Sequence, residues 1–342
     1  MYTLQAKPVQ LSTAPRAAHA TTMSRLVPIA ALLRPDAVEK FKVDDYTYYN
    51  FRNETYHFPA QDIEYERLDI MHQLIYDIAL NGQLHLAHLR ASPGRILDIG
   101  FGDGFWMTEM QQQYPEAEVI GIDLDSAVTS TPGSRPMFRS PVDFNAPQWP
   151  VEDSSVDLVH VAQLLGCVPD WLQFYRKAYR CLRPGIGHLE HVEIDWAHRT
   201  TDPQFPAEAA DLYNWWHWIR QASELAGKSL ACRDDTEDLL EEAGFRDVSH
   251  RRIRVPVFWT GKRDRKDIDL AHGYQTAMGP KNSQSFHGFS MLLFTRYLHW
   301  TPQQVRDLCD RVLKIIEYRQ SCPQLHQLYV NLHIWTARRP QT

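Results

Sequence analysis

The sequence predicts a doubly wound α/β fold, in which one mainly parallel sheet is covered by helices on both faces. Short apolar runs alternate with helical stretches of about 10 to 15 residues, the pattern of βαβ units. A glycine-rich turn, "LDIGFGDGFW" at Leu97 to Trp106, directly follows the first of these runs. With 44% apolar and 23% charged residues in a chain of 342, there is ample material for the core of one such domain carrying insertions.

The first 43 residues are rich in Ala, Thr and Pro without periodicity, so residues 1–43 are expected to form a disordered tail before a domain spanning 44–342. Because no acidic residue precedes Asp36, a transit peptide is the alternative interpretation of this tail. From Asp62 onward, apolar residues recur at helical spacing as far as Asn81-Gly82, a pair typical of a helix end.

Alternating strands and helices are expected after this first helix. The expected strands are 94–100, 117–124, 137–144, 156–163, 188–196, 249–259 and 328–339, and the helices between them include 106–114, 171–182, 209–226 and 234–245. Helical insertions at about 200–232 and 260–325 interrupt the alternation, and they are expected to form a lid. Helix 209–226 carries aromatic residues on all sides (Tyr213, Trp215, Trp216 and Trp218), which predicts burial on several sides.

The glycine turn predicts a nucleotide-type site, because open α/β sheets bind ligands at the carboxyl ends of their strands. Gly100, Gly102 and Gly104 permit a tight turn and close approach to the backbone. A dinucleotide fingerprint reads G-x-G-x-x-G, but its third position here is Phe105. Asp98, just before the first glycine, is unfavourable for a pyrophosphate and suits a ligand with a cationic end.

Two further carboxylates extend this site. Asp123 ends the second strand about 20 residues beyond the turn, where a carboxylate accepts hydrogen bonds from ribose hydroxyls. Asp143, with Phe144 beside it, is placed to accept from an adenine amino group; a helix cap or a loop role is the alternative for both carboxylates. A ligand with an amino-acid end, a ribose and an adenine is S-adenosylmethionine. Phe101 and Leu124 are predicted to line the same site.

Composition excludes several other classes of function. A net charge of −6 gives no basic footprint for direct nucleic-acid binding. No apolar run approaches the roughly 18 residues that a membrane span needs. Five scattered cysteines without C-x-x-C spacing indicate neither a disulfide framework nor a zinc site, and favour a reducing intracellular compartment.

The sequence says less about the residues that would bind the methyl acceptor. Methyl transfer from a sulfonium depends mainly on positioning, so no catalytic residue can be named from the sequence. His191, Glu193 and Asp195 alternate along the fifth strand and share one face. They are interpreted as a polar strand end with satisfied hydrogen bonds in preference to a catalytic base. Metal binding by His188, Glu190 and His191 is not expected, because adjacent strand residues point to opposite faces.

Long segments beyond these residues resemble the LaeA-like methyltransferases of filamentous fungi, which are class I S-adenosylmethionine-dependent enzymes. The resemblance extends from about Tyr46 to Pro340. It is carried by Tyr49 to Leu74, Val142 to Val161, Asp170 to Trp196 and Leu332 to Pro340. It implies a seven-stranded class I methyltransferase sheet. It also carries the family's cofactor positions over to Asp98, Gly100, Gly102, Gly104 and Asp123.

The resemblance further implies a nuclear methyltransferase that regulates secondary-metabolite gene clusters and development together with velvet-domain proteins. The family's turn usually reads G-C-G-T-G-I-W, whereas this chain has Phe101, Asp103 and Phe105, which puts the affinity for the cofactor in question. Two alternatives stay open. One is a cytoplasmic tailoring methyltransferase acting on a small secondary metabolite, and the other is a non-catalytic binding protein that keeps the fold.

Overall fold

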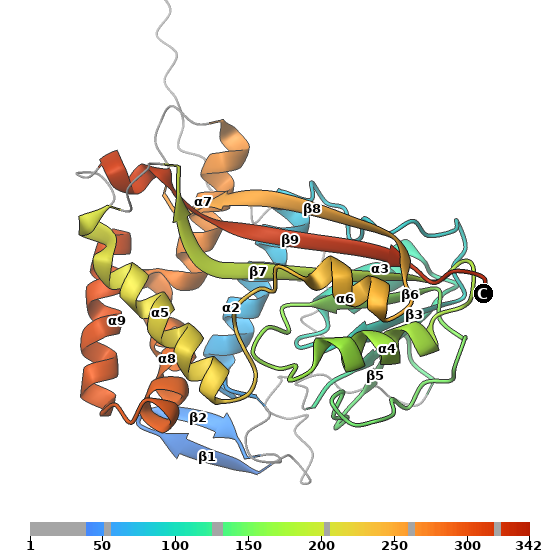
Figure 1. The fold of residues 1–342 in the computed structure, drawn as a ribbon, viewed down its shortest axis with the longest axis horizontal. Helices are drawn as coiled ribbons and strands as arrows, with labels where there is room; N and C mark the ends of the chain where they lie inside the picture. The colour runs from blue at the N-terminus through green and yellow to red at the C-terminus, as the bar shows by residue number, and fades with distance from the viewer. Residues whose placement is uncertain (1–38, 51–55, 125–132, 202–205, 259–263, 318–322) are drawn as a thin grey trace, which may run out of the picture.

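A seven-stranded sheet forms the centre of the molecule in a computed structural model that describes residues 39–50, 56–124, 133–201, 206–258, 264–317 and 323–342 (Figure 1). Residues 1–38 of the expected tail lie outside the described residues. The end of that expected tail, Lys40–Val43, forms strand β1, which pairs antiparallel with β2 (Tyr46–Tyr49). The tail boundary at residue 43 is therefore wrong: "KFKV" alternates charged and apolar residues as a strand does, and Phe41 packs on Tyr48.

The strand order of the main sheet is β5-β4-β3-β6-β7-β9-β8. Its strands are β3 (Arg95–Ile99), β4 (Glu118–Ile122), β5 (Met137–Arg139), β6 (Leu158–Ala162), β7 (His188–Thr200), β8 (Arg246–Pro256) and β9 (Leu328–Arg338). β3 to β7 run parallel, whereas β9 is antiparallel to both of its neighbours. The doubly wound sheet predicted from the sequence is confirmed. β5 is shorter than the predicted strand 137–144, because Pro141 cannot donate to a ladder.

Helices cover both faces of this sheet. They are α2 (Asp62–His72), α3 (Phe105–Gln113), α4 (Trp171–Cys181), α5 (Ala210–Leu225), α6 (Thr236–Glu242), α7 (Arg265–Met278), α8 (Ser283–Tyr297) and α9 (Pro302–Glu317). In Figure 1, α4 and α6 lie in front of the sheet and α2 and α7 lie behind it. α2 continues into a π-helical turn, η2 (Gln73–Ala79), where the sequence pattern had predicted an unbroken α-helix.

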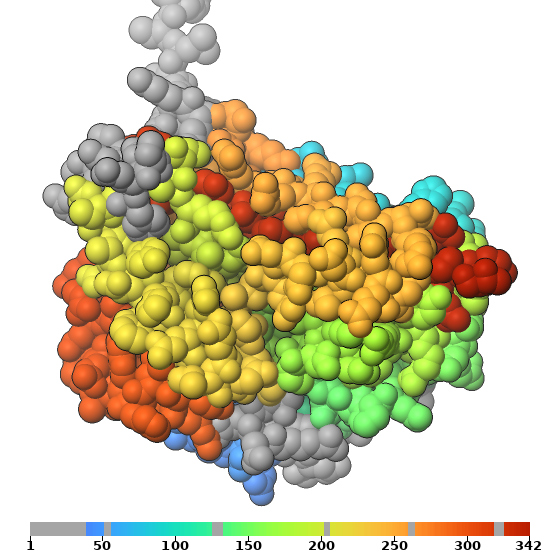
Figure 2. Space-filling model, in the orientation of Figure 1, coloured from blue at the N-terminus to red at the C-terminus, as the bar shows by residue number. Residues whose placement is uncertain are grey.

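The two insertions build a helical body at one end of the sheet, where α5, α8 and α9 pack together (Figures 1 and 2). Trp215 of α5 is fully buried, stacks on Phe286 and donates its indole N–H to Ser290 Oγ at 2.9 Å. Trp216 and Trp218 are partly buried against the core, whereas Tyr213 is 56% exposed. The predicted burial of this helix on several sides therefore does not extend to Tyr213. Within the described ranges, no helix is long and apolar enough to cross a membrane.

The amino ends of three strands are joined by one buried carboxylate, that of Asp157. Its Oδ2 accepts from the backbone N–H groups of Gly94 at 2.6 Å and Arg95 at 2.9 Å, at the start of β3. The same oxygen pairs with Arg183 Nη1 at 2.7 Å, in the turn before β7. Because β6 begins beside Asp157, this carboxylate fixes the relative positions of three central strands, and with them their carboxyl ends.

We expect Asp157→Ala to lower the free energy of unfolding by about 3 kcal/mol, because it leaves two backbone donors and two arginines, Arg90 and Arg183, without their partner. Urea denaturation measures this. Asp153→Ala is the matched control, since the Asp153 side chain is 64% exposed and its pairing with Arg180 is a surface ion pair. That control is expected to change the free energy of unfolding by less than about 1 kcal/mol. Equal losses in the two variants would contradict the role given to Asp157.

Candidate functional site

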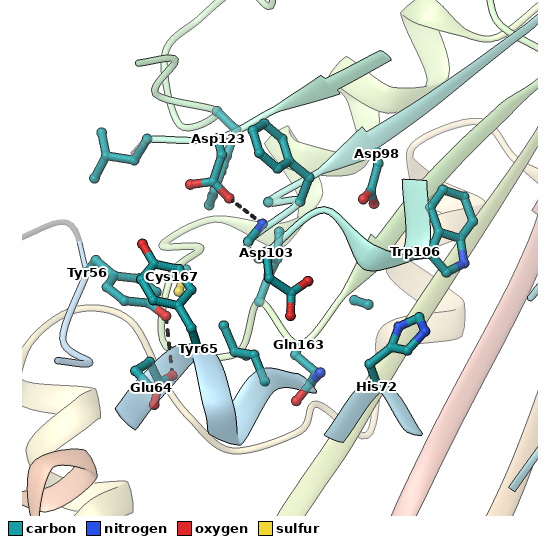
Figure 3. Close-up of a pocket in the computed structure, with 18 of the residues that line it drawn as sticks. Tyr56, Glu64, Tyr65, His72, Asp98, Asp103, Trp106, Asp123, Gln163 and Cys167 are labelled. Carbon is teal, nitrogen blue, oxygen red and sulfur yellow. Dashed lines mark hydrogen bonds between the residues drawn. The ribbon is translucent and has the colours of Figure 1, made fainter. Parts of the chain in front are cut away.

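A pocket of about 1120 Å³, including its open mouth, lies over the carboxyl ends of β3, β4 and β6 (Figure 3). β3 has β4 on one side and β6 on the other, so the pocket lies where the strand order reverses. The predicted cofactor residues that line it are Asp98, Gly100, Phe101, Gly102, Asp123, Leu124, Asp143 and Phe144. The sequence-predicted site is therefore brought together in space, with one exception.

That exception is Gly104, which does not line the pocket. It lies at the N-cap of α3 with φ +77°, and a Cβ there would stand 2.5 Å from Phe138 Cε1. Gly100 is crowded in the same way, because a Cβ there would stand 2.5 Å from Leu164 Cδ2. Gly102 is different: no atom outside the turn would lie nearer than 3.6 Å. Glycine at 100 and 104 thus makes room for neighbouring side chains, and glycine at 102 leaves its backbone open to the pocket.

The carboxylates of Asp123 and Asp143 both bind backbone of the same chain. Asp123 Oδ2 accepts from the backbone N–H of Gly102 at 2.8 Å, so it ties the end of β4 to the glycine turn (Figure 3). Asp143 Oδ1 accepts from the backbone N–H of Asn145 at 2.9 Å, which is the loop role considered as its alternative. Phe144 is buried, with its ring edge-on to Phe174. Ribose and adenine contacts at Asp123 and Asp143 remain predictions.

Asp98 belongs to a buried chain of hydrogen bonds that the sequence did not reveal. Its Oδ1 accepts from His160 Nδ1 at 2.8 Å, so His160 Nε2 is left to accept from the Tyr76 hydroxyl at 2.8 Å. The Trp106 ring stacks on His160 with ring centroids 3.7 Å apart. Asp98 and His160 are partners in the β3–β6 register, a pairing that becomes visible only once the strand order is known.

Asp103 is the functional candidate that sequence reasoning missed as a site residue. Its carboxylate lies in the middle of the pocket in Figure 3, and Oδ1 accepts from the backbone N–H of Phe105 at 3.1 Å. Its other oxygen, Oδ2, is buried and has no hydrogen-bond partner among the described residues. Burial raises the pKa of Asp103 to about 7; the nearby Asp69 and Asp98 act in the same direction, and His72 opposes them. A cation entering the pocket would supply the partner that Oδ2 lacks.

The pocket is covered by the N-terminal part of the chain. The covering residues are Tyr49, Tyr56, Pro59, Glu64, Tyr65, Leu68, His72 and Tyr76. No described residue of the insertions at 200–232 and 260–325 lines this pocket, so their predicted lid role does not extend to the cofactor side, although Phe289 of α8 lines a smaller chamber beside it. Their helices bury their apolar stripes on one another, and α7 and α8 contact α2. The insertion helices α7 and α8 therefore pack behind the N-terminal segment that covers the pocket.

The polar face of β7 is satisfied internally, as the sequence interpretation favoured. His191 accepts from the Tyr175 hydroxyl at 2.9 Å and donates from Nε2 to Glu193 Oε1 at 3.0 Å. Asp195 Oδ2 accepts from Arg199 Nη2 at 2.5 Å. None of these three residues lines the pocket over β3, whereas Glu193 lines a smaller chamber beside it.

Metal binding at His188, Glu190 and His191 has no geometric support. Glu190 Oε2 accepts from the backbone N–H groups of Leu86 and Ala87, both at 2.6 Å, away from the partners of His191. Across the described ranges, no group of three or more His, Cys, Asp or Glu side chains is arranged to hold a metal ion.

The chain matches a family model and is similar in sequence to known proteins. Residues 71–250 match a family model described as "Methyltransferase domain". The chain is 35% identical to the "Secondary metabolism regulator LAE1" of Cochliobolus heterostrophus, over 86% of this chain and 93% of the relative. It is 32% identical to the "Protein-methionine methyltransferase laeA" of Emericella nidulans, over 86% of this chain and 75% of the relative. A putative methyltransferase structure from Anabaena variabilis is similar at 16% identity and a TM-score of 0.48, covering 77% of this chain and 96% of that one.

The pocket residues fit S-adenosylmethionine, which carries a sulfonium and an ammonium. Carboxylates of Asp98, Asp103 and Asp123 line one pocket, and Asp103 contributes a buried oxygen in need of a donor. Tyrosine rings of the cover, such as Tyr65, offer faces that attract a cation.

We expect Asp123→Ala to weaken S-adenosylmethionine binding at least about tenfold, because charge-assisted hydrogen bonds to the turn and to the ribose are lost. Isothermal titration calorimetry measures the affinity. Glu118→Ala is the matched control, since Glu118 begins the same strand and pairs with Arg95 away from the pocket. Unchanged affinity in Asp123→Ala would show that the ribose is held elsewhere.

We expect the affinity for S-adenosylmethionine to depend on pH through Asp103. The raised pKa, about 7, means that Asp103 is a carboxylate above that pH and neutral below it. Binding of the cofactor's ammonium is therefore present at pH 8 and weakens by roughly tenfold toward pH 6. Calorimetry at the two pH values, with Asp103→Asn as the variant that removes the dependence, measures this.

Methylthioadenosine, which lacks the ammonium, serves as the control ligand and is expected to bind equally at both pH values. Tighter binding of S-adenosylmethionine at pH 6 than at pH 8 would contradict the assignment, because it would place the cofactor's carboxylate against Asp103.

Proposed function

Because the chain belongs to the methyltransferases and, within them, to the LaeA/LAE1 family of secondary-metabolism regulators, we propose that it methylates a protein on a methionine thioether. The family membership confirms the resemblance seen in the sequence, together with methyltransferase activity and S-adenosylmethionine as the cofactor. The observation that carries the proposal is the similarity, over 86% of the chain, to a relative named as a protein-methionine methyltransferase. The carboxylate-lined pocket at the switch point supports it.

Bound S-adenosylmethionine supplies an electrophilic methyl group on a sulfonium sulfur. A thioether lone pair forms the new C–S bond as the old one breaks, so the acceptor becomes the sulfonium and no proton is released. The residues of the pocket therefore have to align the two sulfurs and tolerate one positive charge throughout. The carboxylates of Asp98, Asp103 and Asp123 stabilise this positive charge. The cover formed by α2 limits the access of water to the pocket.

The two histidines of the pocket bind other side chains, which agrees with an acceptor that needs no histidine as a base. His160 is bonded through both ring nitrogens, to Asp98 and to Tyr76. His72 Nε2 is 2.9 Å from Glu109 Oε2. A thioether has no proton to remove, whereas a hydroxyl or carboxyl acceptor would benefit from a base in contact with it.

We place this activity in the nucleus, where velvet-domain proteins would bring the enzyme to its targets. The family supports this placement, and the net charge of −6 makes contact through a protein partner more favourable than direct contact with nucleic acid. In this function, methylation regulates the transcription of secondary-metabolite gene clusters.

A cytoplasmic tailoring enzyme acting on a small metabolite is the second candidate. It is favoured by a small chamber beside the cofactor pocket, whose walls are mainly aromatic and aliphatic side chains. The third interpretation, a non-catalytic binding protein, was motivated by Phe101. The ring of Phe101 packs against Phe138 with centroids 5.2 Å apart, at the wall of the pocket, so its size alone is no reason to expect an inactive site.

We expect methyl-labelled S-adenosylmethionine, incubated with the protein and a cell extract of its source organism, to label protein in an acid-stable linkage to methionine. Mass spectrometry of the labelled peptides locates the methyl group. The Asp123→Ala variant provides the matched control and is expected to lose the label. Label confined to small molecules would favour the tailoring enzyme instead.

Deletion of the gene separates the regulatory candidate from the tailoring candidate in the cell. A regulator is expected to change transcripts of several secondary-metabolite clusters, and the Asp123→Ala allele should reproduce the deletion. Loss of one methylated metabolite with distant cluster transcripts unchanged would exclude the regulatory function.

A further inference from the structure

A second, smaller chamber adjoins the cofactor pocket, and its volume of about 320 Å³ includes its opening to solvent. It is lined by Tyr56, Phe58, Arg67, Leu68, Gln163, Leu165, Glu193, Ile194, Trp196 and Phe289, and is called the Arg67 chamber below. Tyr56, Leu68 and Gln163 also line the cofactor pocket, so the two spaces share a wall. The chamber lies at the carboxyl end of β6, which Gln163 directly follows, and beside Glu193, Ile194 and Trp196 of β7.

Arg67 brings a buried charge into this chamber. It is 3% exposed and makes a double hydrogen bond to Glu64, with Nε to Oε2 at 2.9 Å and Nη2 to Oε1 at 2.7 Å. The rings of Phe58, Trp196 and Phe289 surround its guanidinium at 5.8 to 5.9 Å. The third nitrogen, Nη1, is buried and has no hydrogen-bond partner among the described residues. A buried guanidinium N–H without an acceptor is costly, so an acceptor that entered the chamber would stabilise this donor.

Gln163 gives the chamber a second unsatisfied atom, of the opposite kind. It directly follows β6, and its backbone holds φ +56°, a left-handed conformation that is strained for a residue with a side chain. Its backbone N–H donates to Val192 O at 2.9 Å, which fixes the residue in place. Its Oε1 is buried without a donor in the described part of the chain. The chamber thus contains a donor in need of an acceptor and an acceptor in need of a donor, from separate elements.

We propose that the Arg67 chamber binds the methyl acceptor through a neutral carboxamide, whose carbonyl oxygen accepts from Arg67 Nη1 and whose N–H donates to Gln163 Oε1. This inference rests on the proposed function, because the peptide unit of a protein acceptor is such a carboxamide. The aromatic and aliphatic walls take the alkyl part that joins it to the reacting atom. A carboxylate in the same place would face Glu193 and Gln163 Oε1, and Glu64 already occupies two of the three nitrogens of Arg67.

Two probes that differ in one group test this preference. Pentanamide and pentanoate have the same alkyl chain, and neither is a methyl acceptor. With the intact protein and S-adenosylhomocysteine, ligand-observed NMR is expected to show pentanamide binding at least about tenfold more tightly than pentanoate. Equal binding, tighter binding of pentanoate, or no detectable binding of either probe would overturn the proposal, since internal water would then satisfy both atoms.

Two variants test whether the preference for the amide over the carboxylate arises in the Arg67 chamber. Replacing Arg67 would leave Glu64 buried without its cation, so the variant is placed at Gln163. Gln163→Leu is expected to lower the affinity for pentanamide about tenfold and to leave pentanoate unchanged. Ile194→Val, which trims the wall without touching a hydrogen-bonding group, is the control and is expected to affect both probes alike. If each variant changed the affinities for pentanamide and pentanoate equally, the chamber would be selecting its ligand by shape alone.

The outcome is independent of methyl transfer, because the probes lack a thioether. A preference for the amide without labelling of protein methionine would retain the carboxamide site and reject the thioether acceptor. Labelling without the preference would retain the proposed function and reject the Arg67 chamber as the acceptor site.

Discussion

The hydrogen-bond chain from Asp98 through His160 to Tyr76 sets the relation between the sheet and its cover. Asp98 and His160 lie on neighbouring strands, whereas Tyr76 comes from the π-helical turn after α2. Both hydrogen bonds are 2.8 Å long and all three side chains are buried. In a site of low dielectric such bonds are strong and leave little freedom. The wider π turn directs Tyr76 to the histidine, so the position of α2 over the pocket follows from a polar interaction at its base.

The carboxylates of Asp98, Asp103 and Asp123 differ in the hydrogen bonds that they make. Asp98 and Asp123 use their carboxylates to hold His160 and the glycine turn, whereas one oxygen of Asp103 has no hydrogen-bond partner among the residues that the structure describes. Because burial raises its pKa to about 7, the ionised form of Asp103 reduces the stability of the folded protein as pH rises above the unfolded value near 4. A ligand cation reverses this effect by pairing with the carboxylate. The ionised carboxylate of Asp103 therefore lowers the stability of the free protein and raises the affinity of the pocket for a cation, as charged groups in functional sites often do.

The sequence predicts those parts of the molecule that produce a local pattern of residue types. Apolar runs predicted the strands, and spacing placed Asp98, Gly102 and Asp123 in one site. It failed where contacts join segments far apart in the chain: Tyr76 and His160 are 84 residues apart, and no periodicity marks them. The length of β5 was misjudged because Pro141 outweighs the apolar run around it. An amphipathic helix does not reveal which neighbour its apolar face will meet, so the sequence alone does not place the insertions beside the smaller chamber and away from the cofactor pocket.

The two halves of the chain contribute differently to chemistry. Residues lining the cofactor pocket run from Tyr49 to Cys167, all in the first half of the chain. The Arg67 chamber adds Glu193, Ile194 and Trp196 from β7, and Phe289 from insertion helix α8. Because Phe289 also packs on Phe58 in the covering segment, a change in the insertion would reshape the acceptor side while the glycine turn stays intact. Acceptor choice can therefore diverge among related proteins through the insertions, without loss of the cofactor site on which every such reaction depends.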